Sequence, residues 1–235
     1  VFLEQERQVF SPDSRTNIFY ITPRQKRDFM RCYGTPEERF FYLPPGISPE
    51  FRRRPDADRI RREKRRELGV PDEALLLLEV GGHLFGKGVD RVIRAVAALP
   101  EMLRNRCRFC VAGTTSERRC RALWRRSGLP DEALLLPGPR KDIPELLAAA
   151  DLLVHPARNE AAGNALLEAI VAGLPVLCSE VCGFSDFVAE SGGVVVPEPW
   201  EESAFSRALE EMLSRIGEYR ARAVSHCAGH DFFRR

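Results

Sequence analysis

From Leu75 onward, short apolar runs alternate with amphipathic stretches, and this alternation constrains the fold more than any other feature of the sequence. The runs lack strict polar alternation, which is typical of strands that helices cover on both faces. Helical patterns separate them, at Val89, Val92, Ile93 and Val96 and over residues 142–150 and 164–172. This order predicts an α/β fold with a Rossmann-like, doubly wound parallel sheet. The predicted strands are residues 75–80, 107–112, 133–136, 152–155, 175–178 and 193–196.

The N-terminal part of the chain is too short for a Rossmann-like domain of its own. Its patterns predict a strand at 17–21, a helix at 23–32 and a strand at 40–43. We therefore predict that residues 1–45 are the tail of a preceding domain. The chain starts without methionine and ends in Phe-Phe-Arg-Arg, which indicates a fragment.

The remaining boundaries follow from the same patterns. Pro44, Pro45, Gly46 and Pro49 interrupt regular structure and predict a linker at 46–52. Residues 53–215 form the predicted sheet domain, and residues 216–235 a C-terminal helical segment that is expected to be truncated.

Composition excludes several classes of protein. The formal net charge of +2 gives no general reason to expect a nucleic-acid partner. No apolar run reaches the ~20 residues that a membrane-spanning helix needs. The seven scattered cysteines favour a reducing, cytoplasmic setting. Cys107 and Cys110 lie three apart in a predicted strand and so point to opposite faces, which opposes a shared metal.

The loop that follows the predicted strand 152–155 is the first candidate site. In an open α/β sheet a ligand binds at the carboxyl ends of the strands, and the small residues 161–163 precede a helix whose positive end suits a phosphate group. Glu160 and Glu168 could then accept hydrogen bonds from sugar and ribose hydroxyls. An ordinary βαβ unit with two surface glutamates is the alternative, and a glycosidase pair is not expected because its carboxyl groups must face one bond.

His155 ends the same strand and is a candidate ligand contact. A histidine that packs at the strand end, without any ligand, is the alternative interpretation. Both interpretations place the ring at the carboxyl edge of the sheet.

A glycine-rich turn at residues 81–88 is the second candidate site. It resembles the phosphate loop G-x-x-x-x-G-K, but Gly88 stands where that motif needs serine or threonine for magnesium, so a nucleoside triphosphatase is not expected. The turn, which includes Gly82, still places Lys87 where it could neutralise a diphosphate without metal. A solvated lysine in a βα turn is the alternative.

The segment 51–68 is strongly basic, with acidic residues interspersed. Such a segment usually forms a solvated helix. The sharper hypothesis is attraction to an anionic membrane surface or to a phosphorylated glycolipid. Its cations are Arg52, Arg53, Arg54, Arg59, Arg61, Arg62, Lys64, Arg65 and Arg66.

Several motifs together indicate a family. The stretch H-P-A at 155–157, E-A-A-G at 160–163, L-E-A-I at 167–170 and A-G-L-P-V-L at 172–177 resembles the E-x7-E region of retaining glycosyltransferases of family 4. Within that family it is most similar to the bacterial lipopolysaccharide core glucosyltransferases. K-G-V-D-R at 87–91, L-P-P-G-I at 43–47 and V-C-G-F at 181–184 occur in the matching order, so the resemblance covers nearly the whole chain.

The resemblance implies a GT-B enzyme, with a nucleotide sugar held in the second of two Rossmann-like domains and the acceptor facing the first. Residues 1–45 would be the remnant of the acceptor domain. The implied reaction moves a hexose, expected to be glucose, from a UDP-sugar to the lipopolysaccharide core with retention and without a metal or other cofactor. The implied location is cytoplasmic, with peripheral contact at the inner membrane. Open alternatives are a non-catalytic nucleotide-sugar-binding module and another donor, such as UDP-GlcNAc or GDP-mannose.

The resemblance also assigns roles to residues. Glu160 would bind the donor sugar and Lys87 the diphosphate, and these two are the predicted catalytic residues. The family's second cation is missing, because Gly86 precedes Lys87, and donor affinity would then depend on substitution by Arg158 or Arg140. The predicted donor-binding residues are Glu168 at the ribose, the backbone of Ala162, Gly163 and Asn164 at the sugar and diphosphate, the backbone of Arg140 and Lys141 at the uracil, and Gly82 and His155.

Overall fold

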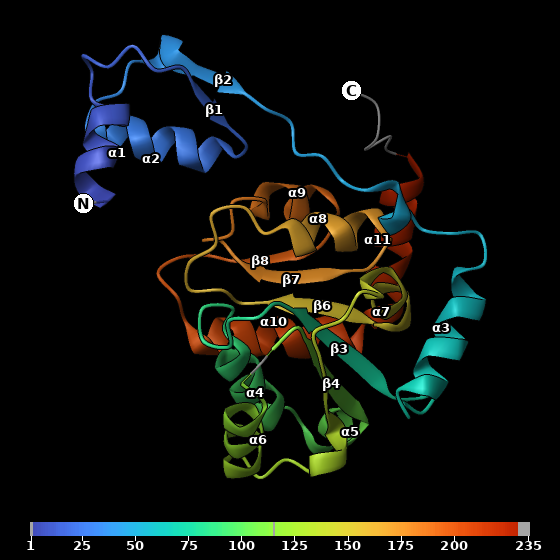
Figure 1. Ribbon diagram of the computed structural model, residues 1–235. Helices are drawn as coiled ribbons and strands as arrows, with labels where there is room; N and C mark the ends of the chain where they lie inside the picture. The colour runs from blue at the N-terminus through green and yellow to red at the C-terminus, as the bar shows by residue number, and fades with distance from the viewer. Residues whose placement is uncertain (1, 115, 230–235) are drawn as a thin grey trace. The chain divides into compact units, whose positions relative to one another are not determined.

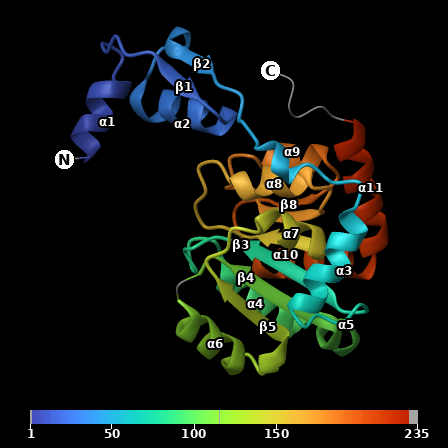
Figure 2. The same cartoon turned by 45° about the vertical axis from the view of Figure 1, so that its right-hand side comes forward.

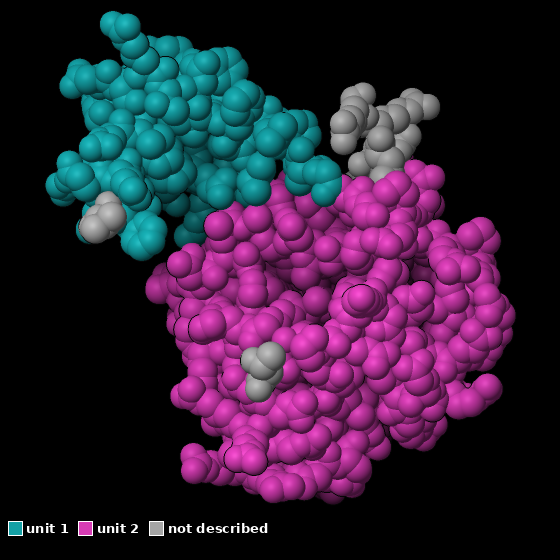
Figure 3. All heavy atoms as spheres, in the orientation of Figure 1, with its two compact units in different colours: residues 1–46 teal, residues 47–235 magenta. Residues whose placement is uncertain are grey.

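The computed structural model describes residues 2–114 and 116–229 (Figure 1). The chain divides into two compact units, Val1–Gly46 and Ile47–Arg235, which Figure 3 colours separately. The segment 46–52, predicted as a linker, contains the 3-10 helix η2 (Pro49–Phe51), which contacts helix α8 of the second unit. Of the predicted C-terminal segment, helix α11 (Ile216–Gly229) is described, and residues 230–235 lie outside the described part.

The first unit is a small α/β assembly. Both predicted strands are present, as β1 (Ile18–Tyr20) and β2 (Phe40–Tyr42), and the structure pairs them in parallel. A short 3-10 helix, η1 (Glu37–Arg39), leads into β2. Helix α2 (Pro23–Tyr33) is also confirmed. It begins where Thr22 accepts a hydrogen bond from the Gln25 N-H. Helix α1 (Phe2–Phe10) was not predicted.

The second unit contains a six-stranded sheet in which every pair of neighbours is parallel, with the order β5-β4-β3-β6-β7-β8. All six predicted strands are confirmed, three of them with the predicted ends. The strand expected from residue 133 starts one residue later because Ala133 closes the 3-10 turn η3 (Asp131–Ala133). The strands are β3 (Leu75–Val80), β4 (Cys107–Ala112), β5 (Leu134–Gly138), β6 (Leu152–His155), β7 (Val176–Ser179) and β8 (Val194–Val196).

Helices cover both faces of this sheet, which makes the fold Rossmann-like. Alternate residues of each strand enter one core with helices α4, α6 and α10, while α7 and α8 contact the strands from the other side. In Figure 1, α8 and α9 lie above β7 and α10 lies below it, and Figure 2 shows the same layers after rotation. The helices not yet given are α3 (Ala57–Glu67), α4 (Val89–Ala98), α5 (Glu101–Arg106), α6 (Glu117–Arg126), α7 (Ile143–Ala149), α8 (Asn164–Val171), α9 (Ser185–Glu190) and α10 (Glu202–Ser214).

The basic helix α3 corrects the expectation of a solvated helix. One face is buried, and the side chain of Arg65 is only 2% exposed. The carboxylate of Asp151, which starts the turn into β6, lies 2.7 Å from Arg61 and 3.1 Å from Arg65, and also accepts a hydrogen bond from the Leu76 N-H. Arg220 of α11 adds a third cation at 3.1 Å. A buried carboxylate therefore fixes α3 and α11 to the end of the sheet, because each charge there has a partner.

The cysteine pair of β4 is buried. Burial raises the pKa of both the Cys107 and the Cys110 thiol to about 12, so both are neutral at physiological pH. In the described ranges 2–114 and 116–229, no group of three or more histidine, cysteine, aspartate or glutamate side chains is arranged to hold a metal ion.

None of the described helices has the length and apolarity needed to cross a membrane.

Candidate functional site

Two loops at the carboxyl ends of neighbouring strands form the centre of the site. The turn 81–88 follows β3 and the loop 156–163 follows β6, and these strands pair in parallel, so both loops start at the same edge of the sheet. The Arg158 N-H donates to the Gly86 carbonyl at 2.9 Å. The Arg91 guanidinium donates to the carbonyls of Pro156 and Ala157 at 3.1 Å each. These contacts join the two candidate regions that the sequence identified separately.

Gly88 makes this close approach possible. Its φ of +76° lies in the left-handed region, and a Cβ atom built on it would lie 2.0 Å from the carbonyl oxygen of Pro156. A side chain at this position would therefore require the two loops to move apart. In the sequence, Gly88 occupied the position where the phosphate-loop motif has serine or threonine. In the structure, the same glycine allows the two loops to pack closely.

Lys87 and Glu160 form an ion pair across the two loops, although they are 73 residues apart in the sequence. The Lys87 stem packs on Gly81, where an added Cβ would lie 3.1 Å from Lys87 Cγ. Hydrogen bonding from His155, then from Lys87, lowers the pKa of Glu160 to about 2 even though burial opposes this. The Glu160 carboxylate is thus ionised at neutral pH and can accept hydrogen bonds from hydroxyl groups.

The start of helix α8 lies against the same carboxylate. Gly163 has a φ of +93°, and a Cβ on it would lie 3.3 Å from Glu160 Cγ and 3.1 Å from Leu166 Cδ1. The loop is held from the other side by hydrogen bonds from the Gly183 N-H to the Glu160 carbonyl and from the Phe184 N-H to the Ala162 carbonyl. The first N-H groups of a helix have no acceptor within it, so the backbone at Ala162, Gly163 and Asn164 presents an electropositive end beside Glu160.

His155 is buried, with a side chain 1% exposed, and lies between two carboxylates. Its Nδ1 is 3.0 Å from Oε1 of Glu79, and its Nε2 is 3.3 Å from Oε2 of Glu160. Each ring nitrogen therefore faces a carboxylate of the protein, so the position of the ring does not require a ligand contact.

Glu79 lies against His155 from strand β3 and was not identified from the sequence. It is the single charged residue in the apolar strand β3, and its side chain is 0% exposed. Burial raises its pKa. Its position in an apolar run that predicts a buried strand could have drawn attention to it, because a buried carboxylate needs a partner.

The other predicted residues lie around this centre. Glu168 is in the second turn of α8 and half-buried, and burial together with the charge of Glu50 raises its pKa. Gly82 lies near the end of β4, where an added Cβ would be 3.5 Å from the Gly113 carbonyl oxygen. The contacts found among the described residues do not link Glu168 or Gly82 directly to the Lys87–Glu160 pair.

The two arginines that could replace the family's second cation are both bound to carboxylates. Arg158 donates to both Asp90 oxygens at 2.7 Å. Arg140 binds Asp142 and reaches Glu67 of α3 at 2.9 Å. The positive charge of each guanidinium is therefore already balanced by a carboxylate.

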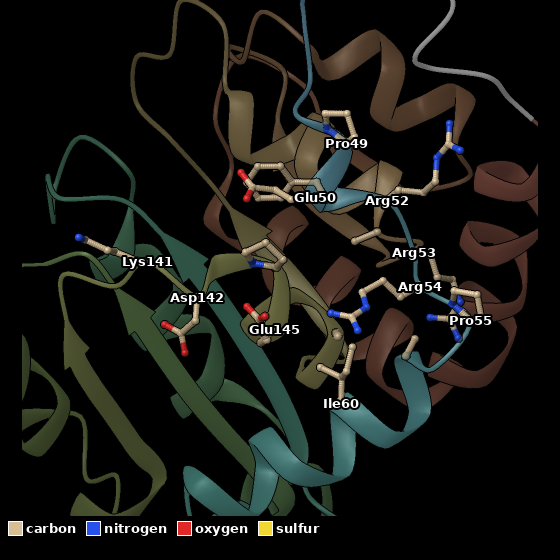
Figure 4. Close-up of a pocket in the computed structure, with 15 residues that line it drawn as sticks. Pro49, Glu50, Arg52, Arg53, Arg54, Pro55, Ile60, Lys141, Asp142 and Glu145 are labelled. Atoms are coloured by element: carbon tan, nitrogen blue, oxygen red, sulfur yellow. The ribbon is translucent and has the colours of Figure 1, made fainter.

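A cavity of about 570 Å³ lies between η2, the start of α3 and the start of α7 (Figure 4). Lys141 and Asp142 belong to its lining, as does Glu50, whereas Lys87 and Glu160 do not. The cavity therefore adjoins the predicted uracil-binding segment and the Glu168 side of α8, and it is separate from the ion pair.

Comparisons with known proteins identify the family of the chain. The family model described as "Glycosyl transferases group 1" matches residues 60–225. The lipopolysaccharide glucosyltransferase WaaG of Escherichia coli is 40% identical over 211 residues, which are 89% of this chain and 56% of that protein. A D-inositol 3-phosphate glycosyltransferase of Thermobispora bispora is 30% identical over 225 residues, or 88% of this chain and 50% of that protein.

Solved structures agree on the fold. The crystal structure of WaaG, a glycosyltransferase involved in lipopolysaccharide biosynthesis, superposes with a TM-score of 0.89 at 37% identity, covering 99% of this chain and 64% of that one. HepE from Anabaena, solved with UDP and glucose, has a TM-score of 0.77 at 19% identity, covering 91% of this chain and 57% of that one, and shows the fold alone.

The chain thus spans about half the length of the curated relatives that it matches. The predicted α/β fold of the GT-B type is confirmed, as is the resemblance to the lipopolysaccharide glucosyltransferases. The chain belongs to the glycosyl transferases group 1 family.

Proposed function

We propose that the full-length protein is a retaining glycosyltransferase that moves glucose from UDP-glucose to the lipopolysaccharide core without a metal ion or other cofactor. The family and the similarity to WaaG support glycosyl transfer in general. The donor and the acceptor named here go beyond that. The choice of glucose as donor sugar and of the lipopolysaccharide core as acceptor rests on the similarity to WaaG and on the chemistry of the site.

The observation that carries the proposal is the convergence of a cation, a carboxylate and a helix start at one point. Lys87 comes from the β3–α4 turn, whereas Glu160 and Gly163 come from the β6–α8 loop. A nucleotide sugar needs these three features together, because it combines a diphosphate with neutral hydroxyl groups.

Each group would then have a defined role in transfer. Lys87 and the backbone N-H groups at Gly163 and Asn164 would bind the diphosphate and stabilise the negative charge that grows on it as the bond to the sugar breaks. Glu160, which is ionised at neutral pH, would accept hydrogen bonds from sugar hydroxyls. The departing phosphate would assist removal of the acceptor proton.

The nucleoside would bind on the Lys141 side of the site. Glu168 would accept hydrogen bonds from the ribose, and the backbone at Arg140 and Lys141 would contact the uracil. Because the Arg140 side chain is held by Asp142 and Glu67, this contact would use its backbone. Gly82 would leave room beside the diphosphate.

The acceptor would bring the protein to the cytoplasmic face of the inner membrane as a peripheral protein. The basic segment 51–68 would contribute to this contact. Several of its cations are already paired, including Arg54 with Asp56 and Arg59 with Glu63, so we expect a weak electrostatic contribution.

Two alternatives are distinguished by experiment. A non-catalytic binding module is suggested by Gly86, since neither Arg158 nor Arg140 is free of carboxylate partners to replace the missing cation. Another donor, such as UDP-GlcNAc or GDP-mannose, would use the same diphosphate contacts.

Transfer by the full-length protein is the deciding measurement. We expect radiolabelled glucose to pass from UDP-glucose to lipopolysaccharide that ends at the unmodified core, and the Glu160→Gln variant to lose this activity by about a hundredfold or more. The Glu37→Gln variant, which removes an exposed carboxylate that is paired with Lys26 in the first unit, is the matched control. Binding of UDP-glucose without transfer or donor hydrolysis would contradict the proposal in favour of the binding module.

A further inference from the structure

A buried pair of side chains supports Glu160 from the side opposite Lys87. Glu79 is the penultimate residue of β3 and His155 the last residue of β6, and these neighbouring strands bring Nδ1 and Oε1 to 3.0 Å. The contact lacks hydrogen-bond geometry, and both Glu79 oxygens are buried without a hydrogen-bond partner among the described residues. A carboxylate that is 0% exposed and nearest to a histidine is an unusual feature that the proposed chemistry leaves unexplained.

The geometry constrains the protons on the ring. Both nitrogens of His155 face carboxylate oxygens, and a bare ring nitrogen would place its lone pair against negative charge. Burial alone would lower the pKa of His155, but Glu79 and Glu160 together raise it to about 10. A proton on each ring nitrogen therefore agrees with the two distances, 3.0 Å to Glu79 and 3.3 Å to Glu160.

We propose that Glu79 and His155 are positioning residues that hold Glu160 in place for the donor sugar when a bound diphosphate draws Lys87 away. Lys87 and His155 both contact Oε2 of Glu160, so among the described contacts Oε1 is the oxygen left for sugar hydroxyls. Without the His155 contact, Glu160 would lose its remaining partner each time Lys87 moved to the phosphates. This inference rests on the proposed function and assigns the buried pair to the sugar end of the site.

The groups around the ring are few. The Cys182 thiol, from the loop after β7, lies 3.8 Å from the His155 carbonyl oxygen, and Cys178 is the residue opposite His155 in the β6–β7 register. The ionisable groups that face His155 from neighbouring elements are Glu79, Glu160, Cys178 and Cys182, with Lys87 beyond Glu160.

Two substitutions of the histidine separate its contacts. The amide nitrogen of His155→Asn can take the position of Nδ1 beside Glu79, but the side chain is too short to replace Nε2. The amide of His155→Gln can reach the Nε2 position and keep a donor toward Glu160. Binding of UDP and of UDP-glucose to these variants is compared by calorimetry, with His226→Gln of α11 as the control.

We expect His155→Asn to lower the affinity for UDP-glucose by about tenfold, to leave the affinity for UDP within about twofold, and His155→Gln to recover part of the loss. If His155→Asn lost affinity equally for UDP and for UDP-glucose, or lost none for either, the positioning role would be overturned. The proposed function would not be affected by that result. Binding of neither ligand by the wild-type protein would overturn the proposed function and this inference with it.

Heteronuclear NMR of the imidazole nitrogens tests the buried pair independently of any ligand, and its measurement on the wild-type protein does not depend on the folding of a variant. In the wild-type protein at neutral pH we expect both His155 nitrogens to carry protons, and we expect Glu79→Gln to lower the midpoint of the His155 titration by more than about one pH unit. A bare ring nitrogen at neutral pH in the wild-type protein would overturn the inference.

Discussion

The Gly88→Ala variant is expected to lose at least about 3 kcal/mol of unfolding free energy, because the new methyl group meets backbone. Its Cβ would lie 2.0 Å from the Pro156 carbonyl oxygen, and its φ of +76° is unfavourable for any residue with a Cβ. Proteins of this size unfold with about 5–15 kcal/mol, so the loss is a large share of total stability. It should appear as a fall in Tm of roughly 10 °C by calorimetry.

Gly128→Ala is the matched control for this variant. Gly128 has nearly the same φ, +72°, but an added Cβ there would meet no atom within 4 Å. The conformational penalty alone should cost about 1 kcal/mol. Equal falls in Tm for the two variants would show that the approach of the 81–88 turn to Pro156 does not constrain the fold.

The Lys87→Met variant is expected to bind both UDP and UDP-glucose about a hundredfold more weakly, since methionine keeps the apolar stem but removes the charge that we assign to the diphosphate. Lys26→Met, which removes a lysine that is similarly paired with a glutamate at 2.6 Å in the first unit, should leave both affinities unchanged.

Comparison with Glu160→Gln makes the assignment specific. That variant should weaken binding of UDP-glucose but not of UDP, because Glu160 is assigned to the sugar alone. Calorimetric titration with UDP and with UDP-glucose gives the ratio of the two affinities for each variant. A Lys87→Met protein that loses affinity for UDP-glucose only would contradict the role of Lys87 at the diphosphate.

Sequence patterns were sufficient to predict most of the second unit. Strands β3, β4 and β6 have the predicted ends because buried parallel strands are continuous apolar runs between clear turn signals. Helices α5, α6 and α10 were not predicted individually. In α6 half of the residues are arginine, and its buried residues are only Cys120 and Trp124, so the apolar stripe is narrow.

Long-range charge pairing could not be predicted in the same way. The basic residues of α3 were predicted to be solvated, because Asp151, which neutralises Arg65, lies 86 residues later in the sequence. The candidate site shows the same limit. Glu160 and Lys87 were identified from separate motifs, but their contact depends on Gly88 and on the hydrogen bond between Arg158 and Gly86, which only the folded backbone defines.

Glu79 shows why the buried pair was missed. In the sequence, a glutamate near the end of a run of leucines could equally lie in solvent at the end of a strand. Its contact with a histidine depends on His155, which lies in the neighbouring strand. Local patterns predict that both residues lie in strands. They do not predict which strands are neighbours or which side chains meet at their ends.

A crystal structure of the protein with bound UDP tests the central assignment most directly, since phosphorus atoms are easily located. The diphosphate should lie within hydrogen-bond distance of the backbone N-H groups at Gly163 and Asn164 and of the Lys87 ammonium, which would have left Glu160. Phosphates located instead among the arginines of the cavity beside η2 would contradict the account.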